Sequence, residues 1–321
     1  MLVGTKLAYI DVYKIDADFE GLPDFLLTQG YGEICMNSKQ GNTGSLLKKK
    51  GKIAAMTGML GLAVMSSAVA ADWSDTFVGY REGGNFKEPG SKSTDIHKDI
   101  LSFTHVSGYK YGSNFFTADF LASDSNDPVN GNGGGAQEVY AVYRHQLSLG
   151  AVSGSSFAFG PVKDMAITAG IDLNSKDDAF SSRVRKFVLG PTFKFDTPGF
   201  LDVSLLLRTE QNNNAYVNKT VTFDPTYGVS IAWGIPLKSI NSKFDGFIDY
   251  IGPKGKDGFG FETKAETLAR TYLMYDLGSL GSKPGTFYAG VGYEYWKNKF
   301  GGNDNSYGDT TAIMIALEAH L

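Results

Sequence analysis

Cysteine is almost absent from this chain of 321 residues, which has a single one at Cys35. A lone thiol closes no intramolecular disulfide and builds no multi-cysteine zinc site, so disulfide scaffolds and cysteine-ligated zinc are excluded. Histidine is scarce as well, and its four positions show no metal-ligand spacing. They are His97, His105, His145 and His320. The sequence therefore predicts neither a metal site nor a cofactor.

An excess of positive charge is also missing. The net charge of −4 argues against binding to a nucleic-acid polymer through phosphate contacts. After residue 71 no apolar run is long enough for a membrane-spanning helix. A chain that crosses lipid without such helices must form a closed barrel, because lipid satisfies no backbone hydrogen bonds. The abundant residues suit strands, turns and interfacial girdles: 40 Gly, 22 Phe and 17 Tyr.

The second half of the first 70 residues has the pattern of a targeting sequence. A basic cluster at residues 48–52 precedes the apolar run Ile53–Val64, and small residues follow up to Asp72. This is the order of a secretory signal, with cleavage expected near Ala70. A membrane anchor helix is the alternative, but the Gly, Ala and Ser content favours a signal. Residues 1–47 are expected to result from a start codon that was assigned too early, with Met36 as the better initiator. The alternative is a genuine amino-terminal extension.

Residues 71–321 show the two-residue period of barrel strands. The last strand is the clearest: Ile313, Ile315 and Leu317 share one face, while Glu318 and His320 lie on the other. The pattern recurs over residues 138–147, 165–174, 201–210 and 287–296. We expect one all-β domain, a transmembrane antiparallel β-barrel of about 12 strands. The expected strands begin near Thr76, Ile100, Phe115, Glu138, Met165, Val184, Leu201, Thr226, Phe244, Thr267, Phe287 and Thr310. The strands of a soluble β-sandwich also alternate between apolar and polar residues, but long strands and charges of both signs on the polar face favour the barrel.

Short stretches spread in order over the same region resemble the Tsx family, the nucleoside-specific channels of Gram-negative outer membranes. They are Asp72–Asp75, Asn85–Gly90, Phe159–Asp164, Leu189–Gly199, Asp249–Gly252 and Tyr293–Trp296. The resemblance implies a monomeric twelve-stranded barrel with a narrow pore in the bacterial outer membrane, and passive uptake of nucleosides. The chain departs from the family at Leu321, where the assembly signal of outer-membrane proteins usually has Phe, and at Lys87–Pro89.

A nucleoside channel needs aromatic faces for the base and ionisable groups for the sugar hydroxyls, with binding weak enough for release. Aromatic residues expected to face the lumen are Tyr140, Phe247, Tyr272, Tyr288 and Trp296. Ionisable residues expected there are Glu138, Arg144, Asp172, Arg208, Glu210, Asp249, Arg270 and Glu294. The family resemblance adds Phe86, which matches a Phe on the nucleoside path. The alternative is that the inward charges only fill and pair across the lumen. Tyr143, Trp233, Tyr275, Tyr293 and Tyr295 are expected to face outward, as an interface girdle.

Two other functions stay open. One is a non-selective small-solute porin or a purely structural barrel. The other is an outer-membrane phospholipase, because His105-Val106-Ser107 resembles the His-x-Ser element of that enzyme. Asn114 is the only nearby residue to orient the histidine. The surrounding residues do not otherwise match, so we expect no enzyme. The expected partners are nucleosides or similar small polar solutes and the lipid of the outer membrane.

Overall fold

The computed structural model describes residues 71–90, 94–127, 134–281, 283–302 and 307–321. The expected secretory signal at residues 48–70 and the expected extension at residues 1–47 lie outside these described residues. Within the described part of the chain, no helix is both long and apolar enough to cross a membrane.

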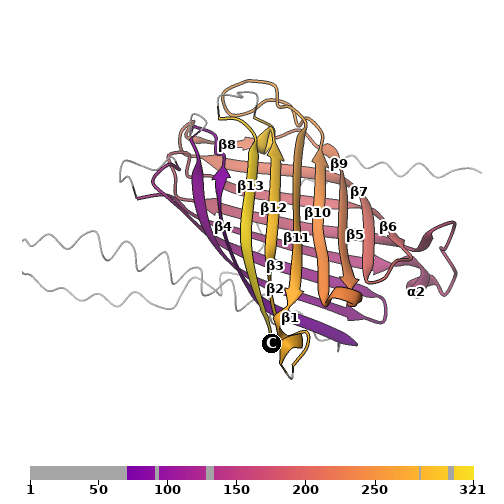
Figure 1. The fold of residues 1–321 in the computed structure, drawn as a ribbon. Helices are drawn as coiled ribbons and strands as arrows, with labels where there is room; N and C mark the ends of the chain where they lie inside the picture. Colours follow the sequence, from indigo (N-terminus) through magenta and orange to yellow (C-terminus); the bar gives the residue numbers. More distant parts are fainter. Residues whose placement is uncertain (1–70, 91–93, 128–133, 282, 303–306) are drawn as a thin grey trace, which may run out of the picture. The chain divides into compact units, whose positions relative to one another are not determined.

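The described residues form a closed 12-strand antiparallel barrel with one short additional strand (Figure 1). The barrel strands are β1 (Trp73–Phe86), β2 (Ile96–Tyr109), β3 (Gly112–Ser123), β4 (Gln137–Ser148), β5 (Val162–Lys176), β6 (Arg183–Phe195), β7 (Phe200–Asn214), β9 (Thr226–Leu237), β10 (Ser242–Ile251), β11 (Glu266–Asp276), β12 (Phe287–Lys297) and β13 (Thr310–His320). The predicted fold is confirmed, and each predicted start lies within a few residues of the observed one. The sequence pattern did not indicate β8 (Lys219–Thr222), which pairs only with the end of β7.

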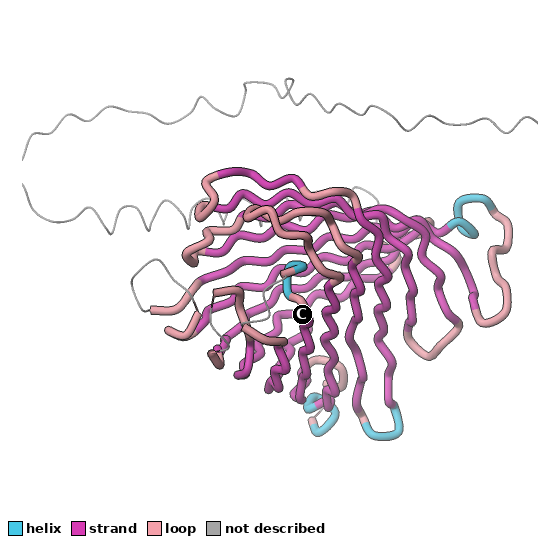
Figure 2. The backbone as a smooth tube through the Cα atoms, turned by 90° about the horizontal axis from the view of Figure 1, so that it is seen from above, coloured by secondary structure: helices cyan, strands magenta, loops and turns pink. Residues whose placement is uncertain are grey.

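Each barrel strand pairs with the next one along the chain, and the first pairs with the last. In the closing pair, Phe77 lies opposite His320 and Gly84 lies opposite Ile313. Both ends of the barrel chain therefore meet at one rim, which we call the terminal rim; the opposite rim is the loop rim. Within the described residues, the helical pieces lie in connections between strands, as Figure 2 shows: α2 (Leu149–Ser153), η2 (Lys238–Ile240), η3 (Leu277–Leu280) and η4 (Lys299–Gly301).

The outward face of the barrel is apolar. On β13, Ile313 and Ile315 are 71% and 61% exposed, and Leu207 on β7 and Val291 on β12 project outward in the same way. Soluble monomers do not leave a continuous belt of such side chains in water, whereas lipid-facing strands require one. The strand register also places the five aromatic side chains predicted to face outward on this face.

Glycines on the inward face make room for large lumen side chains. A Cβ at Gly292 would lie 2.5 Å from Cε1 of Tyr272 on the neighbouring strand. A Cβ at Gly170 would lie 2.6 Å from Cδ of Arg144. Such distances are too short for real contacts, so Tyr272 and Arg144 lie flat against backbone that only glycine provides. The high glycine content therefore serves lumen packing as well as turns.

Candidate functional site in the barrel lumen

Every residue predicted to bind substrate faces the lumen. On β4 and β5, Glu138 lies opposite Lys176, and Tyr140 lies opposite Asn174. On β11 and β12, Arg270 lies opposite Glu294. The remaining predicted positions share these inward faces: Phe86, Arg144, Asp172, Arg208, Glu210, Asp249 and Tyr272. The inward orientation follows from the two-residue period of each strand.

Ion pairs cross the middle of the lumen. The Asp119 carboxylate on β3 accepts from Arg81 Nη2 on β1 at 2.5 Å and from Arg270 Nη1 on β11 at 3.4 Å. Arg270 Nε reaches Glu294 Oε2 on β12 at 2.7 Å. In the order of strands around the barrel, β3 and β11 are separated by β2, β1, β13 and β12. The contact between Asp119 and Arg270 therefore spans the lumen rather than running along its wall.

A second group lies on β4 and β5. Arg144 forms an ion pair with Asp172, and the Tyr140 hydroxyl donates to Asp172 Oδ2 at 3.2 Å. Lys186 Nζ lies 5.9 Å from the centre of the Tyr140 ring and 3.7 Å from Glu210 Oε2. The Asp172 carboxylate thus contacts both the hydroxyl of an aromatic side chain and a guanidinium.

On the same side of the lumen, Glu210 also accepts from Lys254 Nζ at 2.7 Å. Arg208 Nη2 on β7 contacts Asp249 Oδ1 on β10 at 3.3 Å, so this pair crosses over β9. The candidate residues of β7 and β10 are therefore tied to each other and to the loop after β10.

At the loop rim, Glu88 lies at the centre of a cluster of lysines. Its carboxylate pairs with Lys98, with Lys299 Nζ at 2.6 Å and with Lys176 Nζ at 3.3 Å. Glu88 belongs to the segment after β1 and is only 2% exposed. This segment therefore folds inward. Burial by itself would raise the pKa of the Glu88 carboxyl, but the ammonium groups of Lys176, Lys299 and Lys98 outweigh it and hold the pKa well below the ordinary value. Burial lowers the pKa of Lys299 despite this carboxylate.

Cations cover the aromatic rings of the lumen. Lys243 Nζ lies 4.7 Å from the centre of the Tyr288 ring, and Lys299 Nζ lies 4.2 Å from that of Trp296. Further pairs of this kind are Lys98 over Phe86 and Arg270 over Phe247. A flat base that stacks on one of these rings must therefore displace or bridge a cation.

Phe86 lies in an apolar cluster rather than on an open surface. It is 2% exposed and packs with Ile96, Ile100, Ala312 and Met314, against which Leu121 and Tyr272 also pack. The sequence-based role of Phe86 on the solute path therefore stays a prediction, and it requires this cluster to open.

Charged side chains in the middle of the described lumen are buried, among them Arg81, Asp119, Asp172, Arg208 and Glu294. A cavity beside Lys186, Arg208, Glu210 and Lys254 has a volume of about 10 Å³, which is room for one water molecule. The contact between Asp119 and Arg270 narrows the lumen at its own level.

Several lumen residues of this network were not among the sequence candidates. Arg81, Lys98 and Asp119 occupy inward positions of their strands, so the same alternation could have identified them. Glu88 and Lys299 lie in connections, where no period applies and only the fold reveals their inward position.

The element that suggested a phospholipase lies on the outward face near the terminal rim. His105 Nδ1 lies 2.7 Å from Thr76 Oγ1, whereas Ser107 Oγ accepts from Asn114 Nδ2 at 3.5 Å. Asn114 Oδ1 contacts His145 Nδ1 at 2.9 Å. His105 therefore bonds to Thr76 and Ser107 to Asn114, so the two residues do not form the histidine–serine hydrogen bond that activates a serine.

No family model matches the chain, and no curated protein matches it. Among solved structures, the translocator domain of the autotransporter NalP from Neisseria meningitidis is similar, with 12% identity and a TM-score of 0.41 over 85% of this chain and 98% of that one. The KdgM porin is 13% identical, with a TM-score of 0.39 over 76% and 98% of the two chains. OpdO from Pseudomonas aeruginosa is 11% identical, with a TM-score of 0.26 over 78% and 98%. These likenesses concern the barrel architecture alone. The closed register and the apolar outward belt of the described unit themselves define the fold as a membrane β-barrel.

Proposed function

We propose that the chain is a narrow outer-membrane channel for the passive uptake of small polar solutes, with nucleosides as the preferred class. The observation that carries the proposal is the inward face, where aromatic rings and charges of both signs gather across a lumen narrow enough for Asp119 to contact Arg270. The resemblance of ordered segments to the Tsx family supports the choice of nucleosides.

The group of Tyr140, Arg144 and Asp172 offers the chemistry that a nucleoside needs. A base that stacks on an aromatic ring gains about 1–3 kcal/mol in other base-binding proteins. Sugar hydroxyls both donate and accept, so they can donate to Asp172 and accept from Arg144. A nucleoside carries no net charge at neutral pH, so it does not break the ion pair between Arg144 and Asp172. Its binding is therefore weak enough for release.

Passage through this state of the barrel requires movement of side chains. The ion pairs of Asp119 and the apolar cluster around Phe86 both lie on the path. A charge that keeps one partner while it gives up another avoids the cost of an unpaired buried charge. We propose that a solute moves through the lumen by replacing these contacts one at a time. The protein acts as a monomer in the outer membrane, after its signal peptide is cleaved near Ala70.

A structural barrel without transport is the second candidate. It is favoured by the ion pairs across the lumen and by the small size of the cavity near Lys186. A general porin is less well supported, because a wide pore needs open space at its centre.

Liposome swelling separates the three functions. Purified chain is reconstituted into liposomes, and swelling is compared for adenosine and for an uncharged sugar of similar mass. Faster entry of adenosine supports the proposal. Equal entry of both solutes supports a general porin. If neither solute enters faster than it enters protein-free liposomes, the result supports a structural barrel. Amino-terminal sequencing of chain extracted from outer membranes tests the cleavage site.

A further inference from the structure

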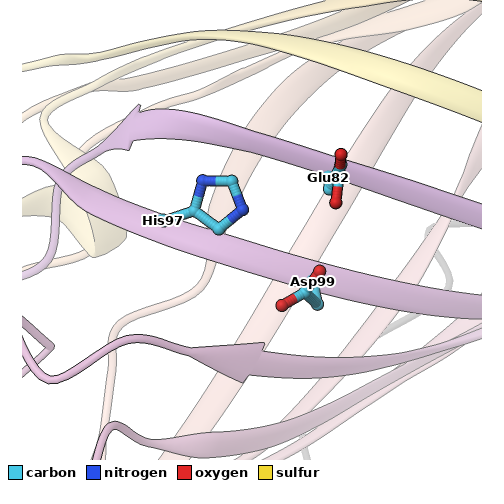
Figure 3. A group of neighbouring side chains, drawn as sticks. All are labelled: Glu82, His97 and Asp99. Carbon is cyan, nitrogen blue, oxygen red and sulfur yellow. The ribbon is translucent and has the colours of Figure 1, made fainter.

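Three side chains that bind metals gather on the outward wall, away from the lumen. Glu82 lies on β1, and His97 and Asp99 lie on β2 (Figure 3). The register places Glu82 directly opposite Asp99. His97 is two residues before Asp99, so both project from the same face of β2. One ligand atom from each residue lies within 4.8 Å of those of the other two.

The position of Glu82 and Asp99 leaves negative charge that the neighbouring side chains do not balance. Like charges directly opposite each other on paired strands are destabilising. The Tyr80 hydroxyl donates to Glu82 Oε2 at 2.9 Å and to Asp99 Oδ1 at 2.6 Å. A phenol has one proton, so it can fully satisfy only one of the two carboxylates. Among the described residues, neither carboxylate forms an ion pair with lysine or arginine, in contrast to the inward carboxylates of the lumen.

A glycine stands beside the imidazole. Gly84 follows Glu82 on the same face of β1, and a Cβ there would lie 3.9 Å from His97 Nδ1 and 3.6 Å from Asp95 Oδ1. These are ordinary contact distances, so a side chain at this position would pack against His97. Asp95 is a third carboxylate nearby, but it lies outside the group of three, and its Oδ1 accepts from the Asn85 backbone N–H.

The site lies near the loop rim, since β1 ends at Phe86 and β2 begins at Ile96. At this height the lipid-facing wall reaches the headgroup region, where a charged side chain costs about 0–1 kcal/mol, compared with about 2–4 kcal/mol for Arg or Lys at the midplane. A hydrated metal ion can therefore reach the site from the aqueous side.

We propose that Glu82, His97 and Asp99 bind one divalent transition-metal ion, with Zn²⁺ as the best-suited ion. One imidazole and two carboxylates form a donor set that Zn²⁺ accepts with bonds of about 2.0–2.2 Å, and water fills the remaining position. Mg²⁺ and Ca²⁺ prefer oxygen donors alone, so the imidazole selects against them. The ion supplies the positive charge that the facing carboxylates lack. This site is independent of transport through the lumen.

The test is a titration of the full chain, purified in detergent without a histidine tag and stripped with a chelator. Isothermal titration calorimetry with Zn²⁺ is expected to give one equivalent per chain, confirmed by metal analysis after dialysis. His97→Asn and Glu82→Gln are each expected to weaken binding by about tenfold or more, because loss of a ligand exceeds the effect of losing its supporting contacts. Circular dichroism confirms that each variant keeps its strands.

His105→Asn is the matched control, since His105 lies on the same strand and the same outward face. It is expected to leave the Zn²⁺ affinity unchanged. Absence of a one-equivalent event in the parent chain, unchanged affinity in His97→Asn, or equal loss in His105→Asn would each overturn the proposal. Displacement of Zn²⁺ by an equal concentration of Mg²⁺ would also overturn it, because the imidazole would then contribute nothing.

Discussion

Asp119 on β3 and Arg270 on β11 contact each other across the lumen, with 3.4 Å between Oδ2 and Nη1. The same carboxylate also binds Arg81 on β1. One acidic side chain therefore binds two guanidinium groups, one two strands away on β1 and one five strands away on β11. Its removal tests both the stability and the closure of the lumen.

Asp119→Asn is expected to destabilise the barrel and to increase solute entry. The substitution leaves Arg81 without a carboxylate, while Arg270 keeps Glu294. Breaking a buried ion pair from one side costs about 3–5 kcal/mol. Denaturant unfolding in lipid vesicles measures the stability, and liposome swelling measures entry. The exposed Glu262→Gln is the control and should change neither. Unchanged entry in Asp119→Asn would show that this contact does not restrict the path.

Phe86 allows packing to be separated from ring stacking. Phe86→Ala removes a buried ring from its cluster with Ile96 and Met314, at a cost of about 3–5 kcal/mol. Phe86→Leu keeps most of the apolar volume and removes only the aromatic face. If the ring contacts the base, Phe86→Leu lowers the ratio of adenosine to sugar entry while it largely keeps stability. An unchanged ratio in Phe86→Leu would limit Phe86 to a packing role.

The Glu88 cluster predicts how the loop rim responds to pH. The pKa of Glu88 in the folded chain lies below its ordinary value of 4.5. A carboxyl with a lowered pKa contributes stability that is fully present above the ordinary value and is lost as the pH falls through the folded value. Solute entry is therefore expected to stay constant from about pH 8 to about pH 5 and to rise only in stronger acid.

Glu88→Gln is the partner experiment for this pH response. Without the carboxylate, Lys98, Lys176 and Lys299 repel one another, so entry should already be raised at neutral pH. Lys256→Gln, at an exposed lysine of the loop after β10, should behave as the parent chain. A rise in entry between pH 7 and pH 5 in the parent chain would contradict the assignment.

The outward position of Ser107 predicts no lipid hydrolysis. Ser107 contacts Asn114, and His105 contacts Thr76, so no base activates the serine. Parent chain and Ser107→Ala should release fatty acid from phospholipid vesicles at the same background rate. Release above background in the parent chain that Ser107→Ala abolishes would restore the enzyme as a candidate.

The sequence predicted the barrel well because one period governs every strand. Alternation placed Tyr140 inward and Tyr143 outward without knowledge of any partner. It could not show that Asp119 meets Arg270, because that contact depends on closure between strands distant in the sequence. Glu88 was missed for another reason, since an inward fold of a connection leaves no periodic trace. The spacing of histidines likewise gave no sign of His97 as a ligand, because the other donors come from paired strands rather than from a local motif.

The outward belt predicts a position-dependent cost for charge on β13. Ile315 lies in the middle of this strand, opposite Val291, and both project toward lipid. Thr311 lies on the same face near the loop rim. Lysine at the bilayer midplane of a barrel costs about 2–4 kcal/mol, falling to about 0–1 kcal/mol near the interface. Ile315→Lys should therefore reduce the free energy of unfolding in lipid vesicles much more than Thr311→Lys. Equal effects of the two substitutions would mean that β13 does not cross the membrane with Ile315 near its centre.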